Sequence, residues 1–160
     1  MMHLCFRLRF LFWIGFLLFV GCKPTKTRFA FLVCNKVPAY LADSSRLRVV
    51  GVFTTWSLAS QAQWNRFVKL SSVYTAPNVR FFAVFTDPDR LVVDEWVRSE
   101  KPPFTVIHDP TFSICNRFAR EVPLTYLLDA QNRLCLAYPG HVTSNQLTRQ
   151  IRNALRHCTR

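Results

Sequence analysis

Two serines separated by two residues, Ser57 and Ser60, form the first pattern that could do chemistry. They follow Leu47–Phe53, an apolar, β-branched run that predicts a buried strand, and a helix is expected to begin beside them. Free amides at a helix N-terminus stabilise an anionic nucleophile, but a serine hydroxyl ionises far too weakly to become one unaided. A catalytic serine would need a general base. His108 and His141 are the candidates, and nothing in the sequence places either beside the serines.

The layout Phe53-Thr-Thr-Trp-Ser-Leu-Ala-Ser60 resembles the redox turn of thioredoxin-like proteins, Phe-x-x-Trp-Cys-x-x-Cys, with serine at both cysteine positions. The family reaction needs a thiolate that attacks a disulfide and a second thiol that resolves the mixed disulfide. The resemblance therefore implies a degenerate motif, Trp56, Ser57 and Ser60, without dithiol chemistry. The family's acidic residue after the pair is Gln63 here and the following proline is Asn65, which also argues against an oxidoreductase at this turn.

A second local motif is Val122-Pro123, which stands just before a predicted strand. It is similar to the family's cis-proline loop, which lies against the redox pair. In relatives, the residue before that proline offers backbone hydrogen bonds to an extended peptide. The resemblance thus implies a peptide-binding site of Trp56, Val122 and Pro123 with no cofactor and no metal. The alternative is that a cis bond there only shapes the start of the strand.

The hydrophobic periodicity predicts a single α/β domain. Beyond two short N-terminal strands that form a hairpin, the order is β-α-β-α-β-α-β-β-α, which predicts a mixed central sheet with helices on both faces. This arrangement resembles the thioredoxin-like fold in its TlpA-like or redoxin branch. The expected strands are 28–34, 37–40, 47–53, 79–85, 104–108, 124–129 and 134–138, and the expected helices are 60–75, 87–99, 109–119 and 143–157, the first opened by a capping box of Ser60 and Gln63.

The N-terminus resembles a bacterial lipoprotein signal. A short basic stretch precedes Phe10–Gly21, an uncharged apolar run of 12 residues that is too short for a comfortable membrane span. The run ends in Leu18-Phe-Val-Gly-Cys22, which is similar to a lipobox. The expected divisions are a signal peptide, a lipidated tether and a thioredoxin-like domain, at residues 1–21, 22–27 and 28–160. Lipid on Cys22 would place the domain on the periplasmic side of the inner or outer membrane. The alternative is an uncleaved N-terminal anchor.

The chain is strongly basic, with a formal net charge of +12. Such a charge suits an anionic membrane, an acidic envelope polymer or nucleic acid. The sequence has no aromatic-basic motif of a nucleic-acid module, so nucleic acid is not an expected partner. A basic face against the membrane or an envelope polymer is one interpretation, and a generally basic proteome is the other.

Six cysteines are present, and no two are spaced as C-x-x-C. Besides Cys5 and Cys22, four would lie in an oxidising compartment, where three pairings are open to them. Cys115 and Cys135 have apolar neighbours and are expected to be packed core thiols. Cys34 and Cys158 lie at a strand end and near the C-terminus, and a disulfide that uses them is a hypothesis.

Three functions are compatible with these patterns. The first is a lipid-anchored envelope protein that binds a peptide or protein partner, is redox-inactive at the usual turn and is not an enzyme. The second is a thiol-disulfide oxidoreductase or antioxidant protein that uses a cysteine outside the family motif. The third is a structural lipoprotein in which the basic surface matters more than the groove.

Overall fold

The computed structural model describes residues 45–74, 78–111, 113 and 121–158. Cys22, the tether, the expected hairpin at 28–34 and 37–40, and most of the expected helix at 109–119 lie outside these residues. Within the described part of the chain, no helix is both long enough and apolar enough to cross a bilayer. The strands are β1 (Leu47–Phe53), β2 (Val79–Phe85), β3 (Thr105–His108), β4 (Leu124–Asp129) and β5 (Leu134–Pro139), and the helices are α1 (Leu58–Ser71), α2 (Arg90–Glu100) and α3 (Ser144–His157).

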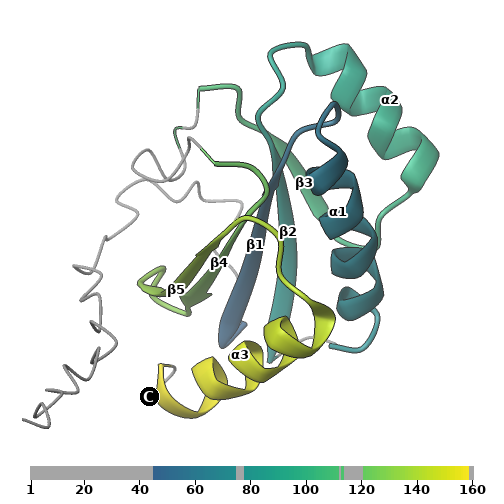
Figure 1. Ribbon diagram of the computed structural model, residues 1–160. Helices are drawn as coiled ribbons and strands as arrows, with labels where there is room; N and C mark the ends of the chain where they lie inside the picture. The colour runs from purple at the N-terminus through teal and green to yellow at the C-terminus, as the bar shows by residue number, and fades with distance from the viewer. Residues whose placement is uncertain (1–44, 75–77, 112, 114–120, 159–160) are drawn as a thin grey trace, which may run out of the picture.

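The strands form a single sheet in the order β3-β2-β1-β4-β5 (Figure 1). β1, β2 and β3 are parallel, whereas β4 pairs antiparallel with both β1 and β5. The expected mixed sheet is therefore confirmed, and the bounds of β1 and β2 match the prediction residue for residue. Both strands are apolar runs that are buried on the two faces of the sheet, as parallel strands require.

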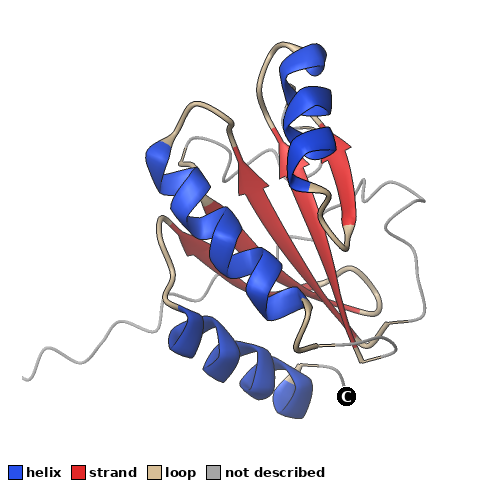
Figure 2. Ribbon diagram, turned by 90° about the vertical axis from the view of Figure 1, so that its right-hand side faces the viewer, coloured by secondary structure: helices blue, strands red, loops and turns tan. Residues whose placement is uncertain are grey.

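The topology brings distant residues to two ends of the sheet. The upper end holds the turn after β1, the residues after β2 and β3, and the residues before β4 (Figure 2). The lower end holds Leu47 at the start of β1, Asp129 at the end of β4 and Leu134 at the start of β5. The topology therefore places the turn that holds Ser57 at the same end of the sheet as Val122, about 65 positions later in the sequence.

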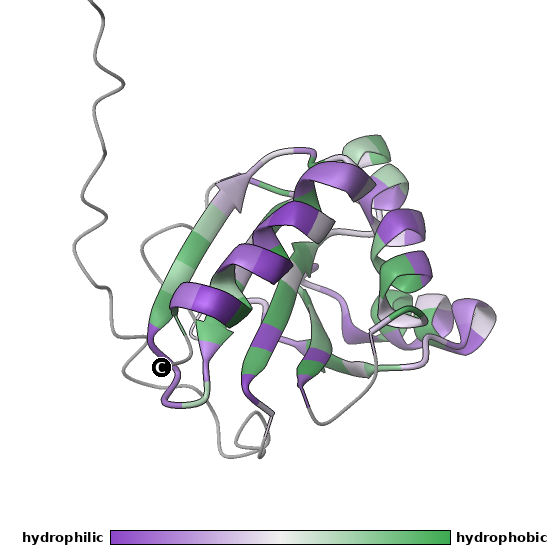
Figure 3. Cartoon of the chain, turned by 90° about the horizontal axis from the view of Figure 1, so that it is seen from below, coloured by the Kyte–Doolittle hydropathy of each residue, from purple (hydrophilic) through white to green (hydrophobic). Residues whose placement is uncertain are grey.

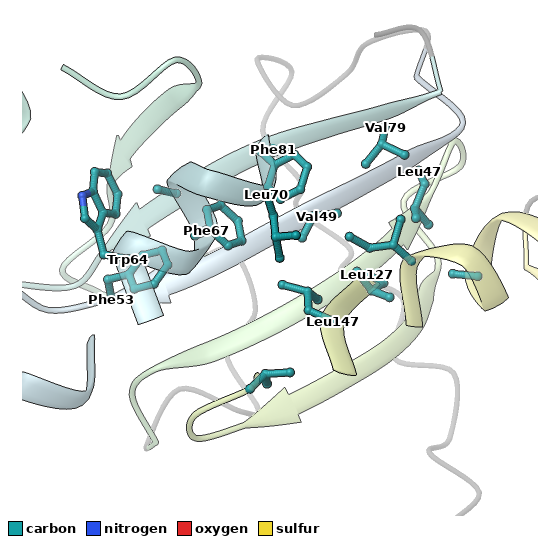
Figure 4. Packing of buried hydrophobic residues seen from close by; sticks show 14 of the residues in the cluster. Leu47, Val49, Phe53, Trp64, Phe67, Leu70, Val79, Phe81, Leu127 and Leu147 are labelled. Atoms are coloured by element: carbon teal, nitrogen blue, oxygen red, sulfur yellow. The ribbon is translucent and has the colours of Figure 1, made fainter. Parts of the chain in front are cut away.

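All three described helices pack on one face of the sheet and share one core cluster (Figure 4). Its centre is aromatic: Phe53 lies 5.5 Å from Trp64 and 5.4 Å from Phe67 between ring centroids, both in edge-to-face geometry. Gly51 leaves room for these rings, because a Cβ at that position would lie 2.5 Å from ring carbons of Phe53. Aromatic packing therefore joins α1 firmly to β1.

The other face of the sheet is also buried, through a second cluster that includes Val50, Phe82, Leu124 and Tyr126. The helix expected to cover this face, at 109–119, falls mainly on residues outside the described part of the chain. The fold class predicted from the sequence, a mixed sheet with helices, is confirmed.

The start of α1 differs from the prediction. The sequence indicates a capping box of Ser60 and Gln63, but the N-cap is Ser57 and the helix begins at Leu58. Ser60 is instead one turn inside the helix and 1% exposed. Both serines precede an amphipathic run, so the capping rule alone does not distinguish them. The one-turn shift brings the helix N-terminus directly to the end of the β1 turn.

Candidate functional site

The two serines both accept hydrogen bonds from backbone amides at the upper end. The Ser57 hydroxyl oxygen accepts from the Ser60 N–H at 3.3 Å, which satisfies one of the free amides of the first helical turn. The buried Ser60 hydroxyl oxygen accepts from the Thr54 N–H at 3.2 Å. Each hydroxyl therefore satisfies one backbone amide of the turn, and neither supplies the thiolate that disulfide exchange requires.

The turn is fixed to the next strand by Asp87, which follows β2 and is 3% exposed. Its carboxylate oxygens accept from the Thr55 N–H at 3.0 and 3.2 Å, and the Thr55 hydroxyl donates at 2.5 Å. The Gln61 side-chain amide donates to the Thr55 carbonyl oxygen at 2.8 Å. Charge-assisted bonds of this kind hold a loop rigidly. Sequence reasoning missed Asp87 and Gln61, although Thr55 and Asp87 both follow the ends of adjacent parallel strands.

The conformation of this turn leaves large apolar side chains in solvent. Trp56 is 71% exposed and Leu58, at the first position of α1, is 80% exposed. An exposed tryptophan beside an exposed leucine on a rigid turn is an unusual use of apolar surface, and tryptophan is enriched at binding hot spots. The prediction that Trp56 can contact a partner is compatible with this exposure.

The peptide bond between Val122 and Pro123 is cis, as the resemblance implies. Val52 near the end of β1 pairs with Leu124, the first residue of β4, so Val122 and Pro123 just before it lie at the upper end. Pro123 is buried and its carbonyl oxygen accepts from the Gly140 N–H at 2.8 Å. Val122 is half-buried against the second core cluster. The residues predicted for the site, Trp56, Ser57, Ser60, Val122 and Pro123, thus all lie at the upper end.

The histidines do not supply a base to the serines. His108 Nε2 lies 2.7 Å from the Asp87 carbonyl oxygen, and His141 is exposed after β5. Among the hydrogen bonds of the described residues, none joins a histidine to Ser57 or Ser60. A serine hydrolase at this turn therefore has no support in the geometry.

The sulfur chemistry lies at the lower end. Cys135 of β5 and Cys158, the C-cap of α3, form a disulfide with a Cα–Cα distance of 5.9 Å. The prediction that Cys135 is a free core thiol is wrong. The register of β4 and β5 shifts at Leu127 and Leu128, so that Leu128 pairs with Leu134, Leu127 pairs with Leu136 and Cys135 is the additional residue. Such a bulge redirects a side chain. Cys22, Cys34 and Cys115 lie outside the described residues.

A cavity of about 520 Å³ adjoins this disulfide. It is lined by both cysteines and by polar side chains that include Arg133 and His157. The buried Asp129 carboxylate accepts from the Arg133 Nε–H at 2.6 Å, so this lining arginine is already paired. The disulfide is only partly buried, and the cavity opens beside it. An external thiol could therefore approach the two sulfurs at this end.

Solved structures provide the comparison. No protein-family model matches the sequence, and no curated protein matches it. StoA from Bacillus subtilis aligns with a TM-score of 0.59 at 15% identity, over 67% of this chain and 83% of that one. This chain has the thioredoxin-like fold.

Two further structures share that fold. The pneumococcal exposed lipoprotein thioredoxin Etrx1 from Streptococcus pneumoniae aligns with a TM-score of 0.61 at 11% identity, over 69% of this chain and 86% of that one. A secreted thiol-disulfide isomerase from Corynebacterium glutamicum aligns with a TM-score of 0.58 at 18% identity, over 70% and 72%. These structural neighbours are thiol-disulfide proteins, and at these identities the likeness concerns the fold.

Proposed function

We propose that this protein is a lipid-anchored envelope protein that binds an extended peptide or protein partner at the upper end of the sheet without exchanging disulfides. The observation that carries the proposal is the combination of an exposed Trp56 with two serines whose hydroxyls are committed to backbone amides. On this proposal, the protein keeps a binding surface at the upper end, and Ser57 and Ser60 stand where the reactive cysteines of the motif would be.

The surface suits an extended segment. Trp56 and Leu58 offer apolar area, and the residues before β4 lie at the same end of the sheet. Main-chain hydrogen bonds give affinity for an extended peptide and apolar contacts select its side chains. Asp87 holds the turn in place, so little conformational freedom is lost on binding.

The location is proposed from two sources. The sequence ending at Cys22 resembles a lipobox, and an acylated Cys22 would bind membrane lipid stably. The structural neighbours include an exposed lipoprotein thioredoxin and a secreted isomerase. Both support a protein outside the cytoplasmic membrane, on the periplasmic side in a diderm.

The test is capture of an unfolded, cysteine-free peptide library by the full chain. We expect Trp56→Ala to weaken binding about 30-fold, the effect of losing a hot spot worth roughly 2 kcal/mol. Val73→Ala is the matched control, because Val73 is also 71% exposed but lies beyond the other end of α1. Equal binding by wild type and Trp56→Ala would reject the proposed surface.

A second candidate is thiol-disulfide exchange at Cys135 and Cys158, favoured by the cavity beside their disulfide. A thiolate of a partner dithiol would attack one sulfur, form a mixed disulfide and release the other cysteine as a thiolate. The partner's second thiol would then resolve the mixed disulfide, so that the partner is oxidised and this protein is reduced.

Differential thiol alkylation with mass spectrometry, on protein taken directly from the cell envelope, separates the two candidates. A partly reduced Cys135–Cys158 pair would support exchange at the lower end. A fully oxidised pair that an excess of partner dithiol does not reduce would leave the disulfide with a structural role.

A further inference from the structure

The acidic side chains are unevenly distributed between the described helices. α3 contains Arg149, Arg152 and Arg156 but no aspartate or glutamate, and α1 also lacks acidic residues. By contrast, α2 carries three carboxylates, Asp94, Glu95 and Glu100, beside Arg90 and Arg98. α3 therefore carries three arginines whose charge no acidic residue of the same helix offsets.

The three arginines lie on one side of α3. Their spacing of three and four residues places them on a common stripe, and all three are exposed. The opposite side of the helix carries Leu147 and Ile151, both 0% exposed in the core. Seen from below, the α3 ribbon consists mainly of hydrophilic residues (Figure 3). α3 is therefore fixed by its apolar side and presents a row of cations to the outside.

No carboxylate among residues 45–74, 78–111, 113 and 121–158 forms an ion pair with this stripe. Asp129, the carboxylate that lines the adjoining cavity, is paired with Arg133. Tyr138 lies close enough to Arg149 for the guanidinium to favour its phenolate, but burial has the larger effect and raises the pKa of Tyr138, so the phenol stays neutral near pH 7.

The second half of α3, which carries Arg152 and Arg156, also lies at a particular end of the molecule. The second half of α3 shares a cavity with Asp129 and Leu134, which belong to the lower end of the sheet. The first described residue, Ser45, precedes β1 and so is also at the lower end. The chain that carries the apolar run Phe10–Gly21 therefore joins the domain at the end where Arg152 and Arg156 lie.

We propose that Arg149, Arg152 and Arg156 form an electrostatic docking surface for a bilayer rich in anionic phospholipid. Each cation held at such a surface contributes to partitioning, and the contributions are close to additive. Docking through the lower end directs Trp56, at the upper end, away from the bilayer. The proposal goes beyond peptide binding and holds whether or not the upper end binds a peptide.

The test is flotation of the full chain with vesicles of phosphatidylcholine alone or mixed with phosphatidylglycerol. The N-terminal apolar run is common to all variants, so differences between them report on the domain. We expect Arg149→Gln/Arg152→Gln/Arg156→Gln to weaken binding to the phosphatidylglycerol vesicles roughly 100-fold, with no change on phosphatidylcholine. The matched control is Arg90→Gln/Arg98→Gln/Lys101→Gln, which removes the same charge around α2 and should change binding only about threefold.

Three results would overturn the proposal. The two triple variants could lose binding equally, which would show that net charge alone is responsible. The α3 variant could bind anionic vesicles as well as wild type does. Wild type could prefer duplex DNA or polygalacturonate over anionic vesicles at the same salt concentration, which would assign the stripe to nucleic acid or to an acidic glycan.

A second measurement needs no variant. Wild-type protein is treated with phenylglyoxal, which modifies arginine, in the presence and absence of phosphatidylglycerol vesicles, and the modified peptides are mapped. We expect the vesicles to protect Arg149, Arg152 and Arg156 at least about fivefold more than Arg90 and Arg98. Equal protection of both groups would contradict the proposal even if the triple variant failed to fold.

Discussion

At the upper end of the sheet, Ser57 and Ser60 accept hydrogen bonds from backbone amides, and at the lower end Cys135 and Cys158 are joined covalently. The first pair satisfies the start of a helix, and the second fixes the end of another helix to an edge strand. Serine oxygens and cysteine sulfurs therefore serve different needs at the two ends. The difference indicates that the turn keeps its geometry with serine in place of cysteine. The turn requires a hydrogen-bond acceptor at position 57 and at position 60, and a serine hydroxyl supplies it.

The largest expected effect comes from returning sulfur to the upper end. The variant Ser57→Cys/Ser60→Cys should gain insulin reductase activity roughly 100-fold above the wild-type background, because helix amides stabilise an introduced thiolate whereas they leave a serine neutral. The rate of insulin precipitation with dithiothreitol as reductant measures this.

Ser57→Cys alone is the control, since it should trap a mixed disulfide without turning over. A folded double variant with no activity would show that the turn has lost more than its sulfurs, and the comparison between the two ends would then fail.

The next effect comes from removing sulfur from the lower end. Cys135→Ala/Cys158→Ala opens a loop of 23 residues, which should lower the free energy of unfolding by about 3 kcal/mol. Urea denaturation followed by circular dichroism measures the change. Peptide capture at the upper end should be unaffected in urea-free buffer. Loss of capture without loss of stability would instead connect the disulfide to function.

Ser60→Ala should have a smaller effect of about 2 kcal/mol, because it leaves the buried Thr54 N–H without its acceptor. The same urea titration measures it. Ser60→Cys is the informative companion, since sulfur is a weak acceptor and should recover part of the loss. An unchanged unfolding free energy for Ser60→Ala would mean that the amide finds water, and that the hydroxyl is not needed by the turn.

Ser57→Ala should have the smallest effect, about 1 kcal/mol, which is typical of a lost N-cap. Ser57→Asp should retain the stability of wild type, because aspartate caps as well as serine and its charge suits a helix N-terminus. If alanine and aspartate at position 57 proved equally destabilising, the capping role of Ser57 would be wrong.

The sequence predicted the central strands well because their signal is strong. Leu47–Phe53 and Val79–Phe85 are apolar apart from Arg48 and Arg80, a pattern that burial on both faces of a sheet explains, and their bounds are confirmed. The sequence alone does not identify the N-cap of α1, because Ser57 and Ser60 are both serines and lie only three positions apart. The choice between them depends on the Thr54 amide, which reaches Ser60 only after the turn has folded.

Other features of the site depend on contacts that no local pattern carries. The bond between Thr55 and Asp87 joins residues 32 positions apart, and only the parallel pairing of β1 with β2 brings them together. The apolar neighbours of Cys135 in the sequence predict a packed core thiol. A bulge in one pair of strands turns its sulfur toward α3, and the sequence gives no sign of that bulge.

The contrast between an exposed Trp56 and a buried Trp64 supplies two built-in fluorescent reporters. Trp64 is 1% exposed within the aromatic core, so its emission should be blue-shifted, inaccessible to iodide and sensitive mainly to unfolding. Trp56 should emit at longer wavelength and be quenched readily until a partner covers it. The difference in iodide quenching between wild type and Trp56→Phe, which subtracts the contributions of Trp13 and Trp96, can therefore follow occupation of the upper end without any added label.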